Sequence, residues 1–168
     1  MNKMKEIRIE KVTLSIGTGE AGAKLDKALK LLNSIADQKP ISTKAKKRIP
    51  TWGIRLGLTI GAKVTLRKDQ EATFKRMLEA IGNKIDPKKI GPGTISFGVP
   101  EYITVPDTKY DIEIGMIGLG VTATLERPGF RVKKRKLQQR KLPASHLITK
   151  EETIEFLKSK FGTEVGAE

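Results

Sequence analysis

The chain has 168 residues, no cysteine, and 33 lysines and arginines against 19 aspartates and glutamates, which gives a net charge of +14. It therefore has no disulfide and no thiolate metal site, and no apolar run approaches the roughly 20 residues of a membrane-spanning helix. The positive charge predicts a polyanionic partner, and nucleic acid fits better than a membrane, because no basic amphipathic helix carries bulky aromatic anchors.

The first half of the chain predicts a strand, a helix and a basic loop. Residues 7–16 alternate between apolar and polar side chains, with a slip near Glu10 that indicates a bulge. After a glycine-rich turn, residues 24–37 carry apolar side chains at helical spacing. Residues 42–57 show neither the period of 2 that marks a strand nor the period of 3.6 that marks a helix, and they are rich in lysine and arginine. We expect them to form a long, mobile, basic loop.

The second half predicts three more strands and two more helices. Residues 60–67, 94–99 and 119–126 each alternate between apolar and polar side chains. A helix is predicted from about residue 69 to residue 81, ahead of a glycine, and the last helix opens with a capping box at residues 149–152.

Alternating strands and amphipathic helices together predict a two-layer α+β fold. We expect a mainly antiparallel sheet, with helices covering one face and the other face open for RNA. Residues 1–168 are expected to form a single domain, with the basic loop at about 42–57 and a basic tail segment at about 131–147. Residues 131–141 within that segment are expected to be irregular.

The outward residues of the four predicted strands share small hydroxyl or basic side chains. Short hydroxyl groups let a phosphate or a ribose hydroxyl approach the backbone, and lysine and arginine neutralise phosphates. Aromatic side chains, which stack on single-stranded bases, do not alternate onto this face, so it favours folded or helical RNA. Threonine is also simply a good strand former on a solvated face. The residues are Lys11, Thr13, Ser15, Lys63, Thr65, Arg67, Thr94, Ser96, Gly98, Thr122 and Thr124, with Glu126 as the single acid.

Residues 17–22 (GTGEAG) satisfy the G-x-G-x-x-G pattern between a predicted strand and a predicted helix, as in dinucleotide-binding folds. Three features argue against a cofactor. The strand has a polar face, Glu20 would repel a pyrophosphate, and residues 42–44 (STK) lack the acidic ribose-binding residue. We interpret the segment as a tight turn whose glycines permit positive φ and whose backbone can contact RNA. A small nucleotide-binding enzyme is the alternative function.

Catalytic and metal-binding side chains are sparse. His146 is the single histidine and lies in a basic context, which favours a structural or phosphate-contacting role. Glu101, Asp107, Asp111 and Glu113 form the one acidic patch, which is either solvated or a docking site for a basic protein. We therefore predict no catalytic residue, no metal, no cofactor and no enzymatic activity.

Several motifs resemble one known family. Residues 9–21 (IEKVTLSIGTGEA), 38–47 (QKPISTKAKK) and 53–67, which contain GIR and IGAKVTLR, resemble the universal ribosomal protein L-five family in order and spacing. Further stretches are similar to its archaeal and eukaryotic branch: SFGV at 96–99, IGL at 117–119, RPGF at 127–130, and His146 ahead of TKEE at 149–152. Many relatives have asparagine where this chain has Ser15.

This resemblance implies a non-catalytic component of the large ribosomal subunit. The family binds 5S rRNA and helps attach it in the central protuberance, contacts P-site tRNA, and bridges to a protein of the small-subunit head. The implied partners are 5S rRNA, large-subunit rRNA, P-site tRNA, neighbouring large-subunit proteins and that head protein. No membrane is implied, and the expected location is the ribosome in the cytoplasm.

The resemblance also assigns residues to two RNA partners. The 5S rRNA-binding residues are expected to be Lys11, Thr13, Ser15, Lys63, Thr65, Arg67, Thr94, Ser96, Thr122 and Thr124. The tRNA-binding residues are expected on the basic loop, at Lys44, Lys46, Lys47, Arg48, Trp52 and Arg55.

Overall fold

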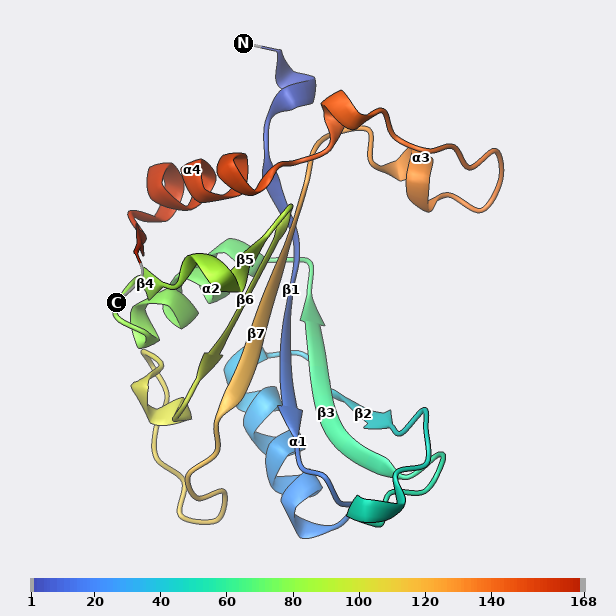
Figure 1. Cartoon of the computed structure of the whole chain (residues 1–168). Coiled ribbons are helices and arrows are strands. Elements are labelled where there is room, and N and C mark those ends of the chain that lie inside the picture. The colour runs from blue at the N-terminus through green and yellow to red at the C-terminus, as the bar shows by residue number, and fades with distance from the viewer. Residues whose placement is uncertain (1, 167–168) are drawn as a thin grey trace.

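The computed structural model describes residues 2–166 and contains one large antiparallel sheet. Its six strands lie in the order β2-β3-β1-β7-β6-β5, and every neighbouring pair is antiparallel. The strands are β1 (Arg8–Gly17), β2 (Ile41–Lys44), β3 (Thr59–Leu66), β5 (Ile90–Gly91), β6 (Thr94–Val99) and β7 (Leu119–Glu126). Strands β4 (Lys84–Ile85) and β8 (Glu164–Val165) form a separate parallel pair. The predicted α+β class and mainly antiparallel sheet are confirmed (Figure 1).

Three longer helices and one short helix accompany the sheet. They are α1 (Ala23–Ala36), α2 (Gln70–Ala80), α3 (Arg131–Lys134) and α4 (Lys150–Phe161). Single 3-10 turns occur at Lys3–Lys5, Pro50–Trp52, Pro87–Lys89, Tyr102–Thr104 and Ala144–His146. The three predicted helices are confirmed to within one or two residues at each end.

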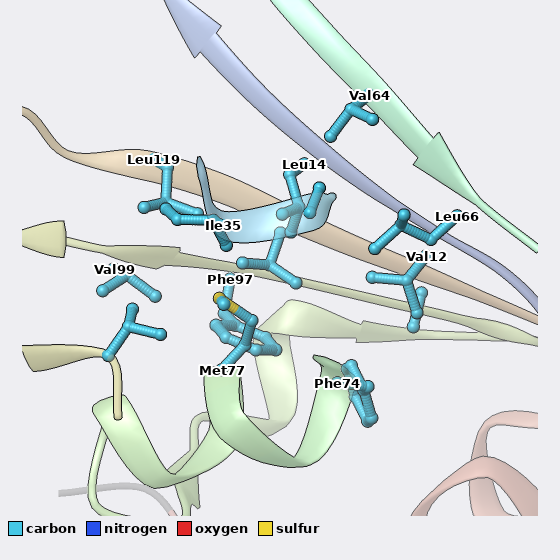
Figure 2. Close-up of a cluster of buried hydrophobic side chains, with 14 of the residues drawn as sticks. Val12, Leu14, Ile35, Val64, Leu66, Phe74, Met77, Phe97, Val99 and Leu119 are labelled. Carbon is cyan, nitrogen blue, oxygen red and sulfur yellow. The ribbon is translucent and has the colours of Figure 1, made fainter. Parts of the chain in front are cut away.

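The core lies between the sheet and helices α1 and α2. Inward-facing residues of β1, β3, β6 and β7 pack against Ile35 of α1 and against Phe74 and Met77 of α2, all of them buried (Figure 2). Burying a side chain of this size contributes about 1.5–3 kcal/mol relative to leaving it exposed. On α1, the helical spacing of the apolar residues predicts a buried stripe that includes Leu29 and omits Leu31, but Leu31 is fully buried and Leu29 is only half-buried.

The predicted bulge in β1 is confirmed. The register between β1 and β7 shifts between Ile9 and Lys11, and this places Ile9 and Val12 together in the core. Three positions apart, these two residues would face opposite sides of a regular strand. The bulge thus keeps the inner face apolar and leaves Arg8, Lys11 and Thr13 on the outer face.

Helix α4 packs against strand β5 at the edge of the sheet and contacts α2. The ring of Phe161 meets that of Phe74 edge-on at 5.2 Å between centroids. The Thr153 hydroxyl accepts a hydrogen bond from the backbone N–H of Gly93 at 3.1 Å. No helix within residues 2–166 is long and apolar enough to cross a membrane.

Two predictions of irregular structure are wrong. Residues Ile41–Lys44, expected to belong in part to the loop, form edge strand β2 against β3, and residues Arg131–Lys134 form α3. Both elements have only four residues, which is too short for a pattern of period 2 or 3.6 to be recognisable. The basic loop is therefore residues 45–58 rather than 42–57.

Candidate nucleic-acid interface

The register of the strands brings the predicted outward residues into rows. Three rows cross neighbouring strands: Lys63-Ser15-Gly120-Gly98, Thr65-Thr13-Thr122-Ser96, and Lys11-Thr124-Thr94. Arg67 follows Leu66, which pairs with Val12, so it extends the third row beside Lys11. Residues predicted separately on four strands thus form one contiguous surface, called the outer face below.

None of the ten side chains predicted to bind 5S rRNA is buried. Ser15, Lys63, Arg67, Thr94 and Ser96 are exposed, and the other five are half-buried by their neighbours across the strands. Ser96 donates a hydrogen bond to the Thr122 hydroxyl at 3.3 Å. Within residues 2–166, neither Lys63 nor Arg67 has an acidic partner within ion-pair distance. Their charges are available to an external anion.

The single acid of the outer face is neutralised from inside the chain. Glu126 lies 2.8 Å from the Arg8 guanidinium and 3.1 Å from Lys134 Nζ, and Lys134 also lies 2.6 Å from Glu10. Burial alone would favour the neutral carboxyl, but the hydrogen bonds from Arg8 and Lys134 outweigh it and lower the pKa of Glu126. The outer face therefore carries no uncompensated negative charge near these residues.

A strip of glycines crosses one end of the outer face. Gly17 pairs with Gly61, and Gly98 pairs with Gly120. Gly17 and Gly98 are exposed, whereas Gly61 is buried beside the Thr43 side chain and Gly120 lies beside the Ser15 hydroxyl. A sugar-phosphate chain therefore has close access to the backbone at Gly17 and Gly98. The individual glycines are evident in the sequence, but their alignment depends on strand register, so the strip is not recognisable before the strands are paired.

The basic loop is held at its base and at its tip by backbone hydrogen bonds. Ala45 N–H donates to the carbonyl of Leu58 at 2.7 Å, and Ile49 and Ile54 exchange hydrogen bonds of 2.9 and 3.1 Å. Ala45 and Ile54 are buried, although the loop has no periodic pattern of apolar side chains.

The predicted tRNA-binding residues all lie on this loop or next to it. Lys46, Lys47, Arg48 and Arg55 are exposed, and Trp52 is 73% exposed. Lys44 differs from the prediction, because it is the last residue of β2 rather than a loop residue.

Two family models match the chain. The model described as "Ribosomal protein L5" matches residues 2–55, and the model of the C-terminus of the same ribosomal family matches residues 59–156. The chain belongs to the ribosomal protein L5 family.

Curated relatives agree over nearly the full length. The chain is similar to large ribosomal subunit protein uL5 of Nanoarchaeum equitans, with 47% identity over 96% of this chain and 97% of the relative. The uL5 proteins of Methanobrevibacter smithii and Sulfurisphaera tokodaii are 43% and 44% identical, over 96% and 98% of this chain and 96% and 95% of theirs. The resemblance to the archaeal branch is confirmed, and as a ribosomal protein the chain is not an enzyme.

In this L5-family chain the glycine-rich turn has its own structural role. The backbone N–H groups of Thr18 and Gly19 both donate to the carbonyl of Ile60, at 2.9 and 3.1 Å. In a dinucleotide-binding loop, such N–H groups point at a pyrophosphate, whereas here the Ile60 carbonyl already accepts both hydrogen bonds. Gly19 and Gly22 have positive φ, as predicted, whereas Gly17 is an ordinary strand residue. Glu20 forms an exposed ion pair with Lys24 at 2.7 Å.

The lone histidine and the acidic patch occupy separate sites. His146 Nε2 donates to the carbonyl of Pro128 at 2.9 Å, and its ring packs against Phe130. In the patch, Glu113 lies 2.9 Å from Lys30 Nζ, and Asp111 accepts a hydrogen bond from the backbone of Glu113. Among residues 2–166, no three histidine, aspartate or glutamate side chains are placed to hold a metal ion.

Proposed function

We propose that the chain is a structural component of the large ribosomal subunit that binds 5S rRNA on the outer face and helps attach it in the central protuberance. The observation that carries this proposal is the contiguous outer face, in which hydroxyl groups, glycines and unpaired cations lie together over four strands. Duplex RNA is recognised mainly by its shape, its 2′-hydroxyls and its phosphates, and this surface matches those contacts. The proposed location is the ribosome in the cytoplasm.

The two family models divide the chain near residues 56–58, but the structure supports a single domain. Strand β1, in the first matched region, pairs on both sides with strands of the second, β3 and β7. One buried apolar cluster also includes residues from both regions. We therefore treat the whole chain as one RNA-binding unit.

Two further contacts form part of the proposal. The basic loop is assigned to P-site tRNA, because its exposed cations lie at the end of the sheet away from α3 (Figure 1). The bridge to a small-subunit head protein is assigned to the segment around Asp111 and Glu113. There Ile112 is 85% exposed and Met116 is also exposed beside the acids, a combination suited to a basic protein.

The experiment that tests 5S rRNA binding reverses two charges of the outer face. The double substitution Lys63→Glu/Arg67→Glu should weaken binding of 5S rRNA by at least about tenfold, because each reversal replaces an attraction to phosphate with a repulsion. The slope of log affinity against log salt should become shallower by about 0.7–0.9 for each phosphate that the protein no longer neutralises. Binding is measured by filter retention over a range of salt concentrations.

The matched control is Lys75→Glu/Lys158→Glu, which makes the same change in net charge on α2 and α4. Lys158 has no ion-pair partner among the described residues, and Lys75 has only a 4.0 Å contact with Glu79. The control should bind 5S rRNA within about threefold of wild type, because Lys75 lies on α2, which covers the inner face of the sheet, and Lys158 lies on α4, so neither belongs to the outer face. Equal affinity and salt slope in all three proteins would remove the outer face from the interface.

A further inference from the structure

Residues 129–145 form a distinct basic arm between β7 and α4. The arm contains seven lysines and arginines and no acidic residue: Arg131, Lys133, Lys134, Arg135, Lys136, Arg140 and Lys141. Helix α3 begins the arm, and the rest is an extended return that projects beyond the end of the sheet (Figure 1). The proposed function leaves this arm without an RNA partner.

The arm is closed at its base by side chains from both of its ends. His146 Nε2 donates to the Pro128 carbonyl, which brings the two flanking residues within 2.9 Å. The guanidinium of Arg127, almost fully buried, donates to the carbonyl of Leu147 at 3.3 Å and to the carboxylate of Glu152 at 2.7 Å. The arm is therefore a pinned loop rather than a free basic tail.

Contacts within the arm also order it. The Arg135 Nε–H donates to the carbonyl of Gln138 at 2.9 Å, and the Gln139 side chain donates to the carbonyl of Lys133. The backbone N–H of Arg140 donates to the carbonyl of Val132 at 3.3 Å. An ordered loop loses less conformational entropy when it binds than a disordered one does.

The arm leaves the sheet on the side of the outer face. Glu126 alternates with Thr122 and Thr124 and so faces outward, and Lys134 reaches it at 3.1 Å. A cleft at this junction is lined by Arg67 of the outer face and by Arg131 and Lys134 of the arm, together with Arg8 and the two acids Glu10 and Glu126, which pair with Arg8 and Lys134. The cations of the outer face and those of the arm are therefore continuous across this cleft.

We propose that the basic arm is a second element of the RNA interface, which contacts the phosphate backbone of the RNA that lies on the outer face. This inference rests on the proposed function, because it requires RNA on that face. Of the seven cations, Lys134 is the one with an acidic partner among residues 2–166, so six charges are available for phosphates. The arm lacks the exposed aromatic side chains that stack on unpaired bases, so its contacts are to the backbone.

The test reverses two arm charges that form no ion pair within the part of the chain that the structure describes, Lys136→Glu/Lys141→Glu. Affinity for 5S rRNA should fall at least about tenfold near 0.1 M salt, and the salt slope should become shallower by about one to two. In hydroxyl-radical footprinting, this arm variant should no longer protect one stretch of 5S rRNA that the outer-face variant Lys63→Glu/Arg67→Glu still protects. The control is again Lys75→Glu/Lys158→Glu, and circular dichroism checks that each variant is folded.

A second variant, His146→Ala, separates charge from arm geometry. It keeps all seven cations but removes the hydrogen bond that closes the base of the arm. Affinity should fall several-fold with an unchanged salt slope, because the arm must then be ordered during binding.

The outcomes distinguish this inference from the proposed function. If the arm variant binds and protects 5S rRNA like the control while the outer-face variant fails, the arm is not part of this interface and the inference is overturned. If wild type binds no 5S rRNA, the proposed function fails and the inference fails with it. If both double variants lose the same protected stretch, the arm is not a separate element, which also overturns the inference.

Discussion

Gly61 and Gly17 pair with each other across β3 and β1, yet their surroundings differ. A Cβ atom added to Gly61 would lie 2.7 Å from the carbonyl oxygen of Ile16 and 3.1 Å from the Thr43 hydroxyl. A Cβ atom added to Gly17 would have nothing within 4 Å. Gly17, the glycine that opens the G-x-G-x-x-G pattern, is thus the less constrained of the two.

The first prediction compares these two glycines. Gly61→Ala should lower the free energy of unfolding by about 1–3 kcal/mol, because the Ile16 carbonyl on β1 and the Thr43 side chain on β2 must move to admit the methyl group. Gly17→Ala should change it by less than about 1 kcal/mol, since the position has space and lacks a positive φ. Urea unfolding of both variants provides the measurement. Equal destabilisation would show that the close approach at Gly61 does not constrain the fold.

At the scale of the element, the start of α4 joins local capping to a tertiary ion pair. Glu152 Oε2 accepts a hydrogen bond from the backbone N–H of Thr149, whose hydroxyl accepts one from the backbone N–H of Glu152, as the predicted capping box requires. The other carboxylate oxygen of Glu152 binds Arg127. The bond from the Thr149 backbone is the largest cause that lowers the pKa of Glu152, and Arg127 adds to it.

The second prediction concerns the pH dependence of this element. Because the folded state lowers the pKa of Glu152, its ionised form stabilises the fold above the ordinary value of 4.5, and this stabilisation is lost as the pH falls through the folded pKa. Glu152→Gln keeps an amide able to cap the helix but removes the charge. The variant should be less stable than wild type at pH 7, and the difference should shrink below pH 4.5. Urea unfolding across this pH range provides the measurement.

Glu155→Gln serves as the control, since Glu155 is exposed on the same helix and has no ion pair among the described residues. Its stability relative to wild type should change little with pH. A stability difference for Glu152→Gln that is the same at neutral pH and well below the ordinary carboxyl pKa would show that the carboxylate charge has no role at this helix start.

At the scale of the whole molecule, cations occupy three regions that the fold holds in different ways. The outer face is rigid because it belongs to a six-stranded sheet, the basic arm is pinned at its base, and the basic loop lies at the opposite end of the strands from the arm (Figure 1). A net charge of +14 makes these regions repel one another, so bound RNA should relieve that repulsion.

The third prediction separates the loop from the outer face. Lys46→Ala/Lys47→Ala/Arg48→Ala keeps Ala45 and Ile54 in place, so the variant should fold and should bind 5S rRNA within several-fold of wild type. On assembled ribosomes it should retain P-site tRNA less well, which is measured as faster release of peptidyl-tRNA. Trp52 is the single tryptophan and is exposed, so its fluorescence should change when tRNA occupies the P site.

Loss of 5S rRNA binding with normal tRNA retention would reverse this assignment of surfaces. A fluorescence change of Trp52 on addition of 5S rRNA alone would contradict it independently, because the proposal places no 5S rRNA on the loop.

The sequence by itself determined the four longer strands, the three longer helices, the bulge in β1 and the capping box of α4. Each depends on side-chain period or on groups within four residues of one another, so local chemistry is sufficient to predict it. The family was also evident from motifs, because the motif at 9–21 runs over 13 consecutive residues that include most of β1 and the glycine-rich turn.

Tertiary structure alone decided which strands are neighbours, and with them the composition of the outer face. The alignment of Thr13 with Thr65 and Thr122, and the glycine strip, depend on register between segments up to about 110 residues apart. Strand β2, with four residues at the edge of the sheet, has its identity fixed by pairing with β3 rather than by its own pattern. The pinned base of the basic arm likewise depends on Arg127 and His146 meeting groups that are near in space after β7 and α4 have packed. Charge pattern predicts that a chain binds a polyanion, but only the packed fold decides which cations face the same side.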